Sequence, residues 1–235
     1  MTKRIAGPAT RFRGMALAVA LFAAAPVLAH IKNEATQFPD IEFSDARFDI
    51  VVLVGAGIVP ETPVFEPDKN LSRAELASWA GLAGGLGRGG ENPDTGALAA
   101  AALEAGLITS LEGDAAWADV NVALFDGQLT LDAPDEVPTK AETATFVAEQ
   151  LETDFGLALL EPRGLSLGAT GLVTTIESQS GQGRSGYVIT VGDVALPMDV
   201  HGRVANGPTD LLQWEGLTVV RSFVTGSDAN AGWFY

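Results

Sequence analysis

Residues 67–77 read Pro-Asp-Lys-Asn-Leu-Ser-Arg-Ala-Glu-Leu-Ala, and residues 134–144 read Pro-Asp-Glu-Val-Pro-Thr-Lys-Ala-Glu-Thr-Ala. The two stretches share Pro, Asp, Ala, Glu and Ala in register, and a hydroxyl residue and a cation recur between them. Self-similarity within one chain is typical of a supersecondary unit that is used more than once. The sequence therefore predicts a repeated structural unit.

Each stretch also has the pattern of a helix start. Ser72 is followed three positions later by Glu75, and Thr139 is followed in the same way by Glu142. This spacing is typical of a capping box, in which the hydroxyl and the carboxylate satisfy free backbone amides of the first helical turn. We therefore expect a helix to begin at each stretch.

A cation follows the cap in both stretches, Arg73 in the first and Lys140 in the second. A cation in the first turn opposes the helix dipole, which favours acidic residues there. Next to free backbone amides, however, it makes a small anion-binding site. Capping explains the hydroxyl residues and the glutamates. The anion-site hypothesis also explains why a cation follows the cap in both stretches. The predicted ligand-binding residues are Ser72, Arg73, Glu75, Thr139, Lys140 and Glu142.

Further segments accompany the first stretch, namely Phe43-Ser44-Asp45, the apolar run at 50–53, Gly57-Ile58-Val59 and Phe65-Glu66-Pro67. Together with the Ser-Arg-Ala-Glu motif they resemble one repeat of the S-layer homology (SLH) family. A second, more degenerate copy contains Gly106-Leu107-Ile108 and the Thr-Lys-Ala-Glu motif. The repeats span about 43–86 and 96–155, with an insertion in the second copy around residues 117–127.

The resemblance implies a fold and a ligand. In the SLH family three repeats form a three-pronged helical module, and the Arg-bearing motif helps to hold a cell-wall polysaccharide, often through a pyruvyl carboxylate. This chain shows two legible copies, has Lys140 in place of Arg in the second, and lacks the second glycine expected after each Gly-Ile turn.

The N-terminus has the features of a secretory signal peptide. Four cations in residues 3–13 precede an apolar run from Met15 to Ala25, and small residues follow up to Ala29. A basic region, a short apolar region and a small residue at the cleavage point are typical of such signals. We expect residues 1–29 to be removed, which leaves 30–42 as an N-terminal extension of an exported protein in the periplasm or at the cell surface.

The chain is strongly acidic and has no cysteine. It carries 30 acidic and 14 basic residues, a formal charge of −16, and the charge becomes −20 once the four cations of residues 1–29 are removed. Nucleic-acid binding needs clusters of Lys and Arg, so this composition argues against a nucleic-acid partner. It also opposes long-range attraction of an acidic polysaccharide. Without disulfides, stability must come from packing or from metal or partner binding.

The mature chain has two parts with different secondary-structure patterns. Residues 43–160 read as helices, whereas residues 165–235 contain β-branched runs at 171–178, 187–191, 194–198 and 217–224, separated by turn residues. The sequence therefore predicts an α+β protein, with an SLH-like helical module followed by a small all-β barrel or sandwich. Two repeats would leave an apolar face of the helical module uncovered. We expect the β domain to cover it, and a fragment lacking that domain to self-associate.

Motifs of nucleophilic or phosphate chemistry are lacking in the sequence, so we expect a non-catalytic protein without a cofactor. The favoured function is binding of a cell-wall polysaccharide or another envelope component. One alternative is an accessory or assembly subunit that docks a partner protein through the β domain. Another is a periplasmic copper-binding protein, in which His30 at the mature N-terminus and His201 supply the metal ligands.

Overall fold

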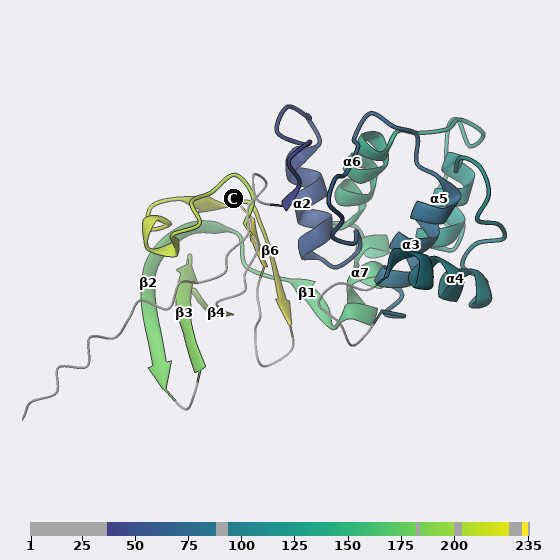
Figure 1. Ribbon diagram of the computed structural model, residues 1–235. Coiled ribbons are helices and arrows are strands. Elements are labelled where there is room, and N and C mark those ends of the chain that lie inside the picture. Colours follow the sequence, from purple (N-terminus) through teal and green to yellow (C-terminus); the bar gives the residue numbers. More distant parts are fainter. Residues whose placement is uncertain (1–36, 88–93, 182–183, 200–203, 226–231, 235) are drawn as a thin grey trace, which may run out of the picture.

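The computed structural model describes residues 37–87, 94–181, 184–199, 204–225 and 232–234. The fold is mixed α+β, as predicted, with helices in the first part of the chain and antiparallel sheets in the second (Figure 1). The predicted signal peptide lies outside the described residues. Within them, no helix is long and apolar enough to cross a bilayer.

Six α-helices make up the helical part of the described chain. They are α2 (Arg47–Gly55), α3 (Arg73–Ala83), α4 (Thr95–Glu104), α5 (Trp117–Phe125), α6 (Lys140–Gln150) and α7 (Asp154–Leu160). Their buried residues form one continuous apolar core, to which α2 contributes every residue from Ile50 to Val54. The helix that begins after Thr139 ends at Gln150, and the chain turns tightly before α7. A Cβ added at Gly156 would lie 2.2 Å from the Leu151 Cα, so only glycine fits there.

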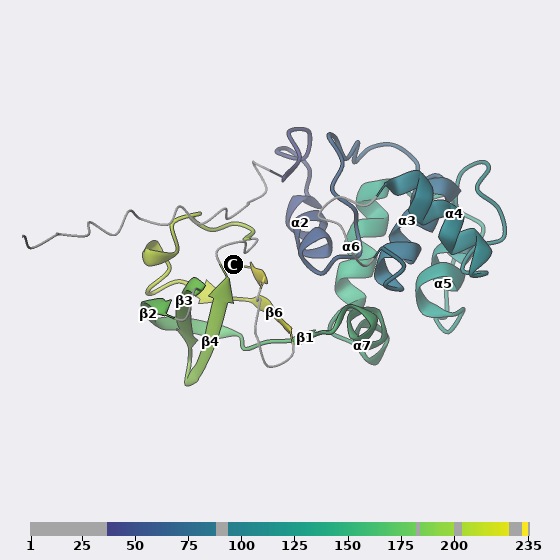
Figure 2. The same cartoon turned by 60° about the horizontal axis from the view of Figure 1, so that its bottom comes forward.

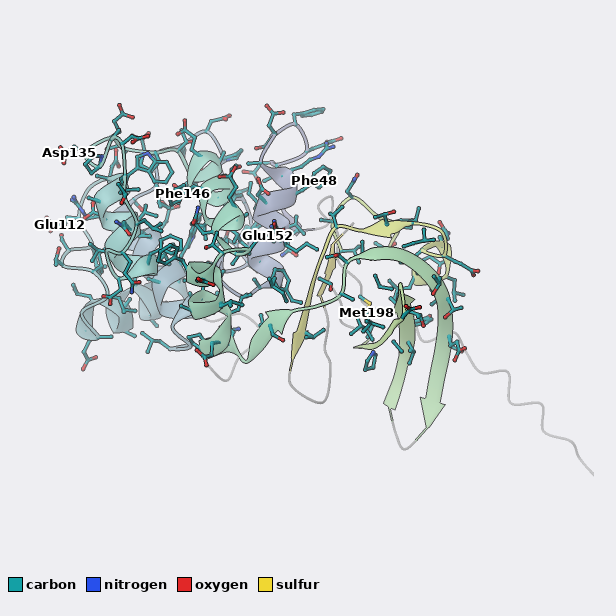
Figure 3. All side chains as sticks on the ribbon, turned by 180° about the vertical axis from the view of Figure 1, so that it is seen from behind. Phe48, Glu112, Asp135, Phe146, Glu152 and Met198 are labelled. Carbon is teal, nitrogen blue, oxygen red and sulfur yellow. The ribbon has the colours of Figure 1, made fainter. Side chains whose placement is uncertain are left out.

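The β part contains two antiparallel sheets. One sheet has the order β4-β3-β2-β5, formed by Val194–Asp199, Arg184–Val191, Gly171–Gly181 and Thr218–Val219. It curls into a half-barrel around a second apolar core, within which Met198 is buried (Figure 3). The other sheet has the order β1-β6-β7, formed by Leu165–Leu167, Arg221–Thr225 and Gly232–Phe234.

The smaller sheet joins the two parts of the molecule. Figures 1 and 2 both show β1 and β6 between the helices and the curled sheet. Phe223 on β6 is fully buried and belongs to the apolar core of the helices, as does Ala205. The side chain of Arg221, also on β6, donates to the Ala148 carbonyl at 3.2 Å and pairs with Glu152 at 2.8 Å. The β part therefore covers one face of the helical part.

A half-buried carboxylate lies close to the same junction. Asp49 on α2 accepts a hydrogen bond of 2.9 Å from the Thr145 hydroxyl on α6. Burial raises the pKa of Asp49, although this hydrogen bond and the nearby Arg221 guanidinium oppose the shift. The Asp49–Thr145 hydrogen bond connects α2 to α6 close to β6.

Candidate functional site: the motif helices and the groove beside them

Both predicted capping boxes are present. At the start of α3 the Ser72 hydroxyl accepts from the Glu75 amide at 3.2 Å, and the Glu75 carboxylate accepts from the Ser72 amide at 3.1 Å. At the start of α6, Thr139 and Glu142 make the same pair of hydrogen bonds, at 3.2 and 2.8 Å. These four residues therefore define two helix starts of equivalent geometry.

A third helix starts in a related way. Where the sequence comparison placed an insertion, the chain forms α5, and its Asp119 carboxylate accepts from the Ala116 amide at 2.9 Å. The structure thus has a third helix start of related geometry beside the two that the motifs predict. The third was missed because Ala116 and Trp117 stand where the other copies have a hydroxyl and a cation. The available signal was the pair Ala118 and Asp119, which repeats the Ala-acid order of the other motifs.

Backbone hydrogen bonds connect the three helix starts in a ring. The first amide of α3 donates to the Gly113 carbonyl before α5, at 2.9 Å. The first amide of α5 donates to Glu136 before α6, at 2.9 Å, and the first amide of α6 donates to Lys69 before α3, at 2.8 Å. Each acceptor lies three residues before a cap, so the three links are equivalent.

The residues directly before the three caps form a second ring of backbone hydrogen bonds, which a proline interrupts. The Leu71 amide donates to the Pro138 carbonyl at 3.1 Å, and the Ala115 amide donates to the Leu71 carbonyl at 2.8 Å. The third link would need an amide hydrogen at Pro138, which proline lacks. The first amide of each of the three helices thus already has a carbonyl acceptor inside the protein.

Each of the two motif cations reaches the acidic residue of another unit. Arg73 donates from Nε and Nη2 to the Asp119 carboxylate of α5, at 3.1 and 3.0 Å. Lys140 Nζ lies 2.8 Å from Glu75 of α3. The two cations therefore connect neighbouring units. In the third position Trp117 replaces the cation, and its ring packs edge-on against Phe146 of α6 at 4.9 Å (Figure 3 labels Phe146).

The contacts at the helix starts lower the pKa of two glutamates. Burial alone would raise the pKa of Glu75, but hydrogen bonds from Lys140 and Ser72 outweigh it, so the pKa lies below its ordinary value. The backbone amide and hydroxyl of Thr139 lower the pKa of Glu142. Both glutamates are therefore held in the charged form at neutral pH.

A groove opens beside the first motif helix, and we call it the α3–α4 groove. It has a volume of about 360 Å³ and is lined by the loop at 59–66, one face of α3, the first turn of α4, and Lys140. Phe65 and Trp79 stack in its wall with ring centroids 6.0 Å apart. Glu75 and Lys140, two of the predicted site residues, thus meet at one groove, whereas Arg73 and Thr139 do not line it.

Glu66 enters this groove from a backbone conformation that is uncommon for its residue type. Its φ angle is +60°, in the left-handed region that non-glycine residues seldom adopt. The Asp40 carboxylate holds the loop in place by accepting from the Phe65 amide at 2.9 Å and from the Glu66 amide at 2.6 Å. Sequence reasoning quoted the Phe-Glu-Pro loop only as part of a family pattern and missed Glu66 and Trp79 as site residues.

The proposed metal ligands cannot be placed in the same way. His30 and His201 lie outside the described residues. In the part of the chain that the structure describes, no three His, Cys, Asp or Glu side chains cluster with the geometry of a metal site.

Comparison of the chain with protein-family models, with curated proteins and with solved structures found no match.

The capping boxes lead to a first prediction. Replacing Ser72 or Thr139 with Ala should lower the free energy of unfolding by about 1 kcal/mol each, because each change leaves an amide of the first turn without its acceptor. Urea denaturation followed by circular dichroism would measure this loss. The control is Thr130→Ala, since Thr130 is exposed. Equal stability of the Ser72, Thr139 and Thr130 variants would contradict a stabilising role of the caps.

Proposed function

We propose that this is an exported, non-catalytic envelope protein whose helical part binds an envelope polysaccharide in the α3–α4 groove. The observation that carries the proposal is a groove with an aromatic wall and polar rim, located beside a motif helix. Its volume of about 360 Å³ lies within the usual range for small-molecule sites, about 300–1,000 Å³.

The lining suits a sugar ring. Pro63 and Val64 are exposed and present apolar surface on which the carbon-bound hydrogens of a sugar can pack, whereas Phe65 and Trp79, each 3% exposed, contribute little of that surface.

The envelope location rests on the sequence. The predicted signal peptide supports export to the periplasm or cell surface, and the SLH-like motifs support a polysaccharide as the ligand. The groove differs from the expected anion site, because the motif cation that reaches it is already paired with Glu75.

A blocking variant tests the proposal. Ala74, at the second position of α3, lines the groove, and Ala74→Gln would place a longer side chain inside it. The matched control is Ala118→Gln at the corresponding position of α5, which does not line the groove. Cosedimentation with purified envelope polysaccharide and isothermal titration calorimetry would measure binding.

Ala74→Gln should weaken binding at least about tenfold, a cost of about 1.4 kcal/mol, while Ala118→Gln should bind as the wild type does. Both variants should melt within a few degrees of the wild type. Unchanged binding by a folded Ala74→Gln variant would show that the polysaccharide does not occupy this groove.

A further inference from the structure

Three charged side chains line the α3–α4 groove, and they are linked to one another. Lys140 Nζ lies 2.8 Å from the Glu75 carboxylate and 3.6 Å from the Glu66 carboxylate. The Lys140 side chain is only 6% exposed, whereas the two carboxylates are 41% and 39% exposed. A ligand entering the groove therefore meets the carboxylates more readily than the cation.

Lys69 completes this arrangement at the edge of the groove. Its ammonium group pairs with the second oxygen of Glu66, and the Lys69 side chain is 67% exposed. Two carboxylates and two ammonium groups balance to zero charge, and Glu66 contacts both cations. Glu66 thus forms ion pairs with both Lys69 and Lys140.

We infer that Glu66 makes the α3–α4 groove selective for uncharged saccharides over carboxylated ones, which rests on the proposed function. An anionic group would have to displace Glu66 from Lys140 and Lys69 or remain beside two carboxylates. An uncharged sugar needs no such displacement and can pack on the apolar wall. The two hydrogen bonds from the Phe65 and Glu66 amides to Asp40 keep Glu66 in place.

A matched pair of ligands tests the inference. The probes are the purified envelope polysaccharide and the same material after its carboxyl groups have been reduced to hydroxymethyl groups. The wild-type protein should bind the reduced form more tightly than the native form. The variant Glu66→Gln removes one carboxylate and releases Lys69, so it should shift the preference toward the native form by about five- to tenfold, as expected for one charge close to a partly solvated ligand.

Two further variants separate the local effect from other causes. Glu112→Gln makes the same change in net charge at an exposed residue at the far end of the helical part (Figure 3), and it should leave the preference unchanged. Lys69→Gln leaves Glu66 with less compensation, so it should shift the preference further toward the reduced form. Opposite shifts in Glu66→Gln and Lys69→Gln cannot arise from general damage to the fold.

The outcomes distinguish this inference from the function on which it rests. If the wild type binds neither form, the proposed function fails and the inference fails with it. If the wild type binds but prefers the native form or binds both equally, groove binding stands and the charge selectivity is overturned. An equal shift in Glu66→Gln and Glu112→Gln would also overturn it, because net charge alone would then explain the preference.

Discussion

Replacing Phe223 with Ala is expected to lower the free energy of unfolding by about 3–5 kcal/mol, the usual cost of truncating a buried phenylalanine. Phe223 lies on β6 but belongs to the apolar core of the helices, with no exposed surface. Its removal leaves a cavity at the junction of the two parts. Urea denaturation monitored by tryptophan fluorescence and by circular dichroism should show this loss in a single transition shared by both signals.

The chain offers a matched control for this experiment. Phe43 is 93% exposed in the loop before α2, so Phe43→Ala should change the free energy of unfolding by less than about 0.5 kcal/mol. If Phe223→Ala were as stable as Phe43→Ala, the two parts would not share a core. If the two optical signals instead separated into two transitions, the helical and β parts would unfold independently.

Replacing Lys140 with Ala should lower the free energy of unfolding by about 2–3 kcal/mol. The loss of a buried ion-pair partner costs about 3–5 kcal/mol when the remaining charge stays buried, and the partial exposure of Glu75 reduces that figure. Lys140 is also buried, and its Nζ lies 5.5 Å from the centre of the Phe65 ring. Lys140→Met keeps most of this packing, so it should lose less stability than Lys140→Ala.

The pH dependence of stability separates the contribution of the Lys140–Glu75 ion pair from that of packing. The pKa of Glu75 is lowered in the folded protein, so its ion pair contributes stability above the ordinary glutamate value of 4.5 and loses it as the pH falls through the folded pKa. The difference in unfolding free energy between the wild type and Lys140→Met should therefore shrink as the pH falls below 4.5 and through the lowered pKa of Glu75. A difference that stays constant from pH 7 to pH 3 would show that packing alone explains the effect of Lys140.

The helix starts could be predicted because their interactions are local. The hydroxyl of Ser72 and the carboxylate of Glu75 lie within one turn, so their spacing in the sequence is enough to indicate the capping box. The same applies to Thr139 and Glu142. The start of α5 could not be predicted because Ala116 has no side chain that can cap a helix. Asp119 accepts a hydrogen bond from the Ala116 amide, but an acidic residue without a preceding hydroxyl residue is a weaker sequence pattern than a full capping box.

The architecture of the β part was only partly predictable. The β-branched runs correctly indicated β2, β3, β4 and β6, because such residues favour extended backbone. The sequence did not show that the strands divide between two sheets, or that β6 would place Phe223 among the helices. Sheet membership depends on pairing between distant segments, such as β1 with β6, which local preferences do not specify.

What the sequence determined by itself was therefore a set of local elements: two capped helix starts, the strands β2, β3, β4 and β6, and an α+β order along the chain. The tertiary structure decided the roles of the cations, since Arg73 meets Asp119 46 positions away and Lys140 meets Glu75 65 positions away. In isolation each cation at a helix start suggested an anion site. Folding brings a carboxylate to each one, because charges removed from water need a partner, and the partner's position is set by how the three units pack around the ring.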